Sequence, residues 1–299
     1  MSQVDLRILT LLERLELGHV LVSDGATGTY LQTKGLEPGG CPEVFNTSHP
    51  EIVKDMAKDY FDVGSDIVLT NSFGGNRVML EKYGFGGRVK DLNRMAVQHA
   101  CSSAPLRKYV LGSVGPTGEF LEPLGDVSEA KMMEILVEQV TSLEEGGADG
   151  VLIETMTALE EMTLAIKAVK ENTKLPVLAT MTFDKGPRGF FTMMGVSPEQ
   201  AVFTLQEAGA DVVGSNCGNG IENMWEIAKK MRELTDGFLI INSNAGIPEI
   251  KKGQVIYTES PEFMSQYFKQ MADIGVNILG GCCGTTPSHI RALVKAVRG

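Results

Sequence analysis

The chain has 299 residues, 43% of them hydrophobic and 22% charged, so it can bury a large core. Its formal net charge of −11, with no basic cluster, argues against nucleic acid and an anionic membrane surface as partners. Five cysteines, an odd number without framework spacing, predict a reducing compartment, by default the cytoplasm. Residues 1–17 lack the uninterrupted apolar stretch of a signal peptide, and no apolar run is long enough to span a bilayer.

Short apolar runs that stop at a polar residue or glycine occur eight times, and each is followed by a loop and an amphipathic stretch. Because these runs are continuously apolar, we interpret them as strands buried on both faces. The predicted strands are residues 19–24, 66–71, 109–114, 150–154, 176–182, 211–217, 238–242 and 276–281. The predicted helices are residues 50–63, 89–103, 128–146, 158–172, 197–209, 221–235, 260–275 and 287–297.

Eight alternations of strand and helix predict fold class α/β, with a (β/α)8 TIM barrel forming a single domain over residues 1–299. An open doubly wound sheet is the rival, but the first turn, residues 25–30, lacks the full dinucleotide-binding glycine spacing. In a barrel the C-terminal ends of the strands converge, so their polar residues become neighbours. The residues expected at this mouth are Asp24, Asn71, Glu154, Thr182, Asn216, Cys217, Asn244, Cys282 and Cys283. The loops expected to form its walls or a lid are residues 29–49, 115–127, 184–196 and 243–259.

Two adjacent cysteines, Cys282 and Cys283, lie between glycines near the C-terminus. Adjacent cysteines rarely form a disulfide, because so small a ring is strained, whereas two neighbouring thiolates suit a soft cation such as Zn2+. Cys217, at another glycine-flanked strand end, is the candidate third ligand. Three protein sulfurs with one open position are typical of a catalytic zinc site rather than a structural one. Cys41 and Cys101 have no metal-like spacing and are interpreted as ordinary structural cysteines.

The other polar residues at the strand ends differ in how strongly they indicate a functional role. Glu154 closes an apolar run, where an unpaired carboxylate is costly, so we interpret it as functional, and Asp24 in the same way. For Asn71 and for Asn244, a role in the site and a role in capping a loop are equally supported, because asparagine side chains also hydrogen-bond to loop backbone. Thr182 and Asn216 are assigned structural roles.

Six segments together are distinctive: Asp24-Gly25-Ala26-Thr27-Gly28-Thr29, Thr70-Asn71-Ser72-Phe73, Gly115-Pro116-Thr117-Gly118, Glu154-Thr155, Asn216-Cys217 and Gly280-Gly281-Cys282-Cys283-Gly284-Thr285-Thr286-Pro287. They resemble the homocysteine S-methyltransferase family, and most closely the homocysteine-binding module of cobalamin-dependent methionine synthases. The resemblance covers almost the whole chain, from about Leu21 to the last predicted helix. It implies a zinc-bearing barrel that binds L-homocysteine as a zinc thiolate and methylates its sulfur to give methionine.

The resemblance also implies roles for individual residues. Cys217, Cys282 and Cys283 match the zinc ligands that carry catalysis, and the Asn244 side-chain oxygen matches a ligand that substrate sulfur displaces. Glu154 matches the residue that pairs with the substrate ammonium group. The full set of substrate-binding residues expected is Asp24, Gly25, Ala26, Thr27, Asn71 and Glu154.

The methyl donor has no evident site, because cobalamin-binding signatures are absent and the chain ends at Gly299, after the first module. We expect a separate methylated corrinoid protein or a small methyl donor, unless the chain is an excised module. One alternative is a non-catalytic homocysteine- or thiol-binding module. The other is an enzyme that methylates a different thiol, or that moves methyl groups between a small donor and a corrinoid protein.

Overall fold

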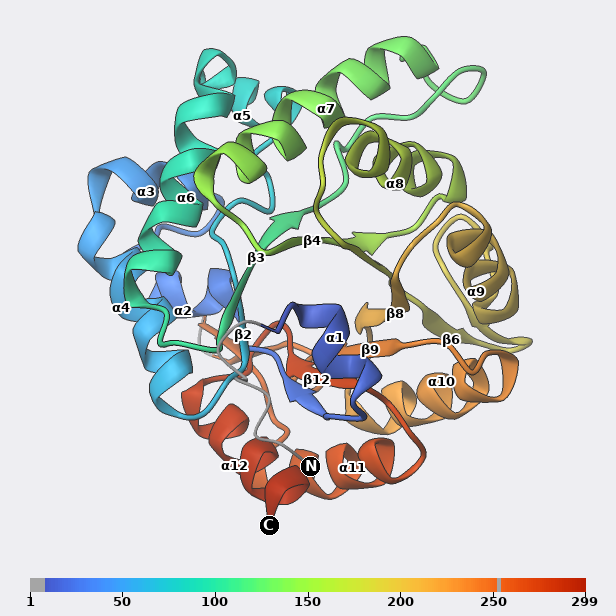
Figure 1. Ribbon diagram of the computed structural model, residues 1–299. Coiled ribbons are helices and arrows are strands. Elements are labelled where there is room, and N and C mark those ends of the chain that lie inside the picture. The colour runs from blue at the N-terminus through green and yellow to red at the C-terminus, as the bar shows by residue number, and fades with distance from the viewer. Residues whose placement is uncertain (1–8, 252–253) are drawn as a thin grey trace.

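The computed structural model describes residues 9–251 and 254–299. Two segments lie outside the described residues: 1–8 and 252–253. Both belong to the predicted single domain, and 252–253 also belong to the predicted loop 243–259. Eight parallel strands form one sheet in the order β1-β12-β9-β8-β5-β4-β3-β2, and helices surround it in a ring (Figure 1). This arrangement confirms the predicted TIM barrel. Within the described ranges, every helix is too short or too polar to cross a bilayer.

All eight predicted strands and all eight predicted helices are present, with bounds that differ by two residues or fewer at each end. The barrel strands are β1 (Leu21–Val22), β2 (Ile67–Leu69), β3 (Tyr109–Val114), β4 (Gly150–Met156), β5 (Val177–Met181), β8 (Val212–Cys217), β9 (Leu239–Ser243) and β12 (Ile278–Gly281). The surrounding helices are α4 (Pro50–Asp62), α6 (Val89–Ser103), α7 (Glu129–Gly146), α8 (Leu159–Asn172), α9 (Pro198–Glu207), α10 (Ile221–Leu234), α11 (Pro261–Asp273) and α12 (Pro287–Arg298).

Several short elements escaped prediction, because one or two turns give too little periodicity to recognise. They are the helices α1 (Leu11–Glu16), α2 (Thr27–Thr33), α3 (Phe45–Ser48) and α5 (Arg77–Glu81), the 3-10 turns η1 (Pro42–Val44) and η2 (Gly86–Arg88), and two hairpins, β6 (Asp184–Gly186) with β7 (Gly189–Phe191) and β10 (Glu249–Lys251) with β11 (Gln254–Ile256).

Helix α1 closes the end of the barrel at which the strands begin, and Figure 1 shows it inside the ring of strands. Its first turn is stabilised by a capping box between Thr10 and Glu13. Leu11 and Leu15, each 1% exposed, pack with leucine, isoleucine and valine side chains from the strands. We call this closed end the base of the barrel, and the opposite end the mouth.

Strands β1 and β2 lie side by side but share no regular ladder in the described residues, so the sheet has a seam between them. Asp66 bridges the seam near the base: its backbone N–H donates to the Val22 carbonyl at 2.6 Å, and its carboxylate accepts from the Val22 N–H at 2.9 Å. Nearer the mouth, the Asp24 carboxylate accepts from the Leu69 N–H at 2.7 Å. Two aspartate side chains therefore complete the ring of strands.

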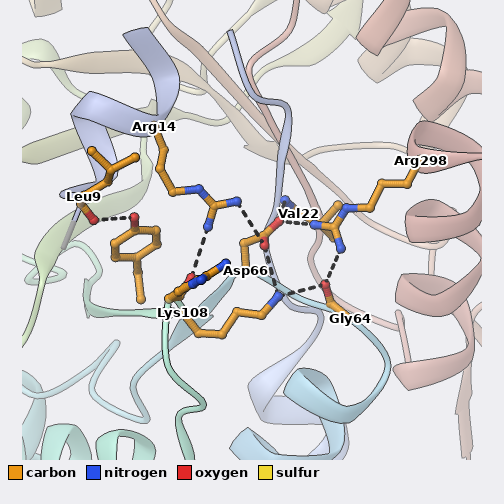
Figure 2. Close-up of polar contacts among 9 residues, drawn as sticks. Leu9, Arg14, Val22, Gly64, Asp66, Lys108 and Arg298 are labelled. Atoms are coloured by element: carbon orange, nitrogen blue, oxygen red, sulfur yellow. Dashed lines mark hydrogen bonds and ion pairs between the residues drawn. The ribbon is translucent and has the colours of Figure 1, made fainter. Parts of the chain in front are cut away.

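Asp66 is also the centre of an ion cluster at the base, shown in Figure 2. Its carboxylate meets the Lys108 ammonium at 3.0 Å, the Arg14 guanidinium at 3.5 Å and the Arg298 guanidinium. The arginines and the lysine also donate to backbone carbonyls, Arg298 to that of Gly64 at 3.0 Å. The cluster thus ties together α1, the start of β2, the start of β3 and the end of α12.

Candidate metal and substrate site

A cavity of about 300 Å³ lies at the mouth of the barrel. Its lining comes from the ends of β4, β8 and β12 and from the segments that follow β1 and β2. Active sites of (β/α)8 barrels occupy this end of the fold. The predicted site residues that line the cavity are Gly25, Ala26, Thr27, Asn71, Glu154, Cys217, Cys282 and Cys283.

The three cysteines come together because the strand ends that carry them are level. Cys217 on β8 and Gly281 on β12 are both paired with Ser243 of β9, which lies between them. Cys282 and Cys283 follow directly, and the Cys282 N–H donates to the Ser243 carbonyl at 2.7 Å. The three cysteine sulfur atoms all lie within 4.8 Å of one another. Sulfurs at this spacing can ligate a single metal ion.

Hydrogen bonds among the three thiols shift their pKa values in opposite directions. Contacts from Cys282 and Cys283 lower the pKa of Cys217 to about 3, whereas the contact with Cys217 raises the pKa of Cys282 and of Cys283. In the absence of a cation, Cys217 is therefore the most acidic of the three thiols. A bound metal would change this balance, because a coordinating metal ion deprotonates the thiol that binds it.

Asn244, directly after β9, contributes an amide at the edge of the thiol cluster. Its Nδ2 donates to the Gly218 carbonyl at 2.8 Å and to the Cys217 sulfur at 3.5 Å. Its Oδ1 is buried and has no hydrogen-bond partner in the described part of the chain. A buried oxygen without a partner is costly, and a cation is one group that can satisfy it. The Asn244 side chain thus presents Nδ2, rather than Oδ1, to the Cys217 sulfur, and the three cysteine sulfurs are by themselves a donor set that Zn2+ accepts.

Glu154, near the end of strand β4, is a buried carboxylate without an ion pair in the described residues. Its Oε1 accepts a 2.5 Å hydrogen bond from the Ser113 hydroxyl, and its Oε2 lies 3.4 Å from the Asn216 amide nitrogen. Burial raises the pKa of Glu154 to about 7. A cationic group entering the cavity would hold this carboxylate in its charged form.

Asp24 lies at the end of the first predicted strand but is not among the residues that line the cavity. It is 1% exposed, and its oxygens accept from the Leu69 N–H at 2.7 Å and the Ser23 hydroxyl at 3.3 Å. Burial raises the pKa of Asp24 to about 8. Its contact with substrate remains a prediction, while the structure gives it a clear part in closing the seam.

The segment after Asp24 lies against the last loop of the chain. The Ala26 N–H donates to the Thr285 hydroxyl at 3.2 Å, so this amide already has a partner within the protein. A Cβ atom on Gly25 would lie 2.8 Å from the same hydroxyl oxygen and 3.0 Å from the Tyr60 ring, so only glycine fits there. The segment is consequently held close to the loop that carries Cys282 and Cys283.

Asn71 lines the cavity and also fastens a loop. Its Nδ2 donates to the Pro42 carbonyl at 2.7 Å and to Asn46 Oδ1 at 3.0 Å, and the Asn46 amide donates back to the Asn71 carbonyl at 2.9 Å. This reciprocal pair ties the predicted loop 29–49 to the end of β2. The substrate role expected of Asn71 stays a prediction.

Sequence reasoning missed several residues of the cavity. Glu43, 3% exposed, lines it and accepts from the Gly74 N–H at 2.6 Å and the Cys41 thiol at 3.2 Å. It lies in η1, a single turn that is too short to show a periodic pattern in the sequence. Asn216 is not among the lining residues but contacts two of them, Glu154 and Thr155. Its place directly before Cys217 in the predicted strand 211–217 was a usable signal, yet it was assigned a structural role. The remaining lining residues outside the predicted set are Gly28, Pro42, Leu69, Thr70, Phe73, Gly74, Met79, Tyr83, Ser113, Thr155 and Gly281.

Residues 21–297 match the sequence model of the homocysteine S-methyltransferase family. Curated methionine synthases of Mycobacterium tuberculosis and Mycobacterium leprae are each 30% identical to the chain over 298 aligned residues. These alignments cover 93% of this chain and 24% of each relative, so the chain spans about a quarter of the length of the curated relatives it matches.

The solved structures show the same fold. The metallated form of the homocysteine methyltransferase MmuM from Escherichia coli superposes with a TM-score of 0.79 at 21% identity, covering 96% of this chain and 100% of that one. A methyltransferase from Methanosarcina mazei has a TM-score of 0.62 at 12% identity, with 97% of this chain and 98% of that one covered. Similarity at these identities supports the barrel architecture.

Proposed function

Because the chain belongs to the homocysteine S-methyltransferase family, we propose that it transfers a methyl group to the thiol of L-homocysteine to give methionine. The observation that carries the proposal is the cluster of three cysteine sulfurs, within 4.8 Å of one another, in a cavity that also holds an unpaired buried carboxylate. We propose that residues 1–299 act as a single domain, and that all five cysteines, which are free, indicate the cytoplasm.

Cys217, Cys282 and Cys283 are the proposed ligands of Zn2+, with Asn244 Oδ1 as the fourth ligand before substrate binds. Zinc at this position would lower the pKa of a coordinating substrate thiol, so that a nucleophilic thiolate forms at neutral pH without a dedicated general base. Oxygen is a weaker ligand than thiolate for a soft cation, so the Asn244 position is the one that can open.

Glu154 is the proposed partner of the substrate ammonium group. Ser113 contacts one carboxylate oxygen and Asn216 the other, which restricts the orientation of the carboxylate. The backbone between Gly25 and Thr27, which lines the cavity, is the proposed contact for the substrate carboxylate, with Asp24 beneath it. Holding both ends of the amino acid fixes the reach of its side chain toward the cysteines.

The methyl group moves as a cation equivalent: a bond from the acceptor sulfur to the methyl carbon forms as the bond from that carbon to the donor breaks. The thiol proton leaves to solvent when homocysteine binds. A methylated corrinoid protein or a small methyl donor is the proposed source. The short span of the chain relative to the methionine synthases favours a second candidate, a homocysteine-binding module that works with segments outside this chain.

Metal analysis and calorimetry test the proposal together. The purified, reduced protein should hold about one zinc ion per chain and bind homocysteine with release of a proton. Turnover assays with free methylcobalamin, S-methylmethionine, S-adenosylmethionine, betaine and a methylated corrinoid protein then separate enzyme from module. Tight binding without turnover by any donor would favour the module. Full metal content and activity in both Cys217→Ser and Cys282→Ser would refute the assignment.

A further inference from the structure

The end of β4 contains a bulge. In the pairing of β4 with β5, Ile153 is opposite Ala179 and Met156 is opposite Met181, so two β4 residues face one residue of β5. The two β4 residues are Glu154 and Thr155. A bulge leaves one residue out of the ladder and redirects the neighbouring side chains, and bulges are common beside active sites.

Asn216 supplies the hydrogen bonds that the bulge has lost. The Thr155 N–H donates to Asn216 Oδ1 at 2.8 Å, and Asn216 Nδ2 donates to the Thr155 hydroxyl at 2.8 Å. The Thr180 hydroxyl, opposite the bulge, also donates to Oδ1 at 2.8 Å. An amide is suited to this place because it offers an acceptor and a donor side by side. Its side chain is completely buried.

The same amide reaches both parts of the site. Nδ2 lies 3.4 Å from Glu154 Oε2 and 3.9 Å from the Cys282 sulfur, and Cys217 is the next residue in the chain. Thr155 and Cys217 have φ values of 64° and 67°, the left-handed region that side chains with a Cβ rarely occupy. Such residues persist only where their surroundings hold them, and both are held next to Asn216.

We propose that Asn216 is a positioning residue that joins the β4 bulge to the end of β8 and thereby sets the separation between the Glu154 carboxylate and the cysteine thiols. The inference rests on the proposed function, in which the substrate ammonium group meets Glu154 and its sulfur meets the cysteines. A fixed separation selects the length of the acceptor. Asn216 would then determine the preference for homocysteine over cysteine, which is shorter by one methylene group.

The matched control is Asn242, which faces Asn216 in the pairing of β8 with β9. It is 1% exposed, and neither polar atom of its side chain has a hydrogen-bond partner in the described residues. Asn242→Ala therefore removes a buried amide of the same size from the same level of the sheet, without disturbing the bulge.

The test measures zinc affinity by competition with a chromophoric chelator, and the dissociation constants of homocysteine and cysteine by calorimetry. We expect Asn216→Ala to weaken zinc binding by about 10- to 100-fold, the usual effect of losing a residue that orients metal ligands. The ratio of the cysteine to the homocysteine dissociation constant should fall toward one. Asn242→Ala should leave both quantities within about twofold of the wild type, since it supports no ligand.

A double variant separates positioning from loss of packing. Glycine adopts the left-handed conformation without cost, so Asn216→Ala should weaken binding less in a Thr155→Gly background than in the wild type. Thr180→Val, which removes one hydrogen bond to Asn216, should give a smaller change in the same direction and serves if Asn216→Ala does not fold.

Two results would overturn the role of Asn216: zinc affinity and acceptor preference in Asn216→Ala that match those of Asn242→Ala, or strictly additive effects with Thr155→Gly. If Asn216→Ala does not fold, wild-type values in Thr180→Val overturn it instead. A wild-type protein that binds zinc but neither acceptor would instead contradict the proposed function, and the zinc affinities of the variants would still decide the positioning role.

Discussion

The base and the mouth of the barrel are opposite ends of the same sheet, and each has a buried carboxylate, but the two carboxylates have different partners. At the base, the buried Asp66 carboxylate meets three cations. At the mouth, the buried Glu154 carboxylate meets no cation in the described residues, and Asn244 Oδ1 has no partner. Non-glycine residues with left-handed backbone lie at both ends, Thr155 and Cys217 at the mouth and Arg107, next to Lys108, at the base. The charge of Asp66 is therefore neutralised within the protein, whereas the carboxylate of Glu154 is left for a cationic group that enters the mouth.

The largest effect expected is on metal retention at the mouth. Cys217→Ser or Cys282→Ser replaces a sulfur ligand with a poor oxygen donor, so zinc affinity should fall by more than about 100-fold and methyl transfer should be lost. Chelator competition and a turnover assay measure both. Cys101→Ser, outside the cluster, is the control and should retain wild-type metal content. Equal losses in all three variants would point to a general defect in folding.

The next largest effect is on stability at the base. Asp66→Asn leaves Arg14, Lys108 and Arg298 without their shared counter-charge and weakens the seam, so the unfolding free energy should fall by about 3 kcal/mol. Urea denaturation measures this change. Homocysteine binding at temperatures where the variant is folded should stay unchanged. A loss of affinity without a loss of stability would remove the distinction between the two ends.

Glu154→Gln makes the corresponding change at the mouth, with the opposite sign for stability. An amide avoids the cost of burying an unpaired carboxylate, so the metal-free protein should be equally or more stable than the wild type. Homocysteine affinity should fall by about 2 kcal/mol, or roughly 30-fold, because the ammonium group loses its charged partner. Calorimetry with homocysteine and with its deaminated analogue tests this, since the variant should bind both about equally. A stability loss as large as that of Asp66→Asn would contradict the comparison.

The last prediction concerns a single titration, the pH dependence of stability that Asp24 gives the metal-free protein. Its folded pKa of about 8 lies above the ordinary value of 3.8, so the folded state holds a proton that the unfolded chain releases. This contribution is fully present below about pH 4 and is lost as the pH rises toward 8, with a slope of at most about 1.4 kcal/mol per pH unit. Asp24→Asn should reduce this slope in a series of urea denaturation curves. An unchanged slope would show that Asp24 is charged in the folded state.

The parts of the molecule predicted correctly from the sequence are those determined by short, continuous stretches of it. The strands were found because buried parallel strands are continuously apolar, and the thiol cluster because Cys282 and Cys283 form a rare pair at the end of such a run. The level of the strand ends, which brings Cys217 to the pair, depends on register. Register could be anticipated only through the choice of a barrel.

The remaining features depend on contacts between distant segments. Asn216 interacts with a bulge some sixty positions earlier, and nothing in its own neighbourhood of the sequence reveals that bulge. Glu43 is buried because the loop carrying it folds over the end of β2 and offers a carboxylate to the Gly74 N–H. Asp24 was expected only as a substrate contact, because the seam it bridges appears once the strands are arranged in space.

The seam has a consequence for how the chain reaches its native state during synthesis. In the described residues, strand β1 forms a ladder only with β12, where Leu21 is opposite Ile278. These two residues are separated by almost the full length of the chain. Its sequence neighbour β2 holds it only through the hydrogen bonds to Asp66 and Asp24. A nascent chain can therefore pair β2 through β9 progressively, but β1 must wait until β12 has left the ribosome. The thiol cluster, divided between β8 and the residues after β12, is assembled in that same final step.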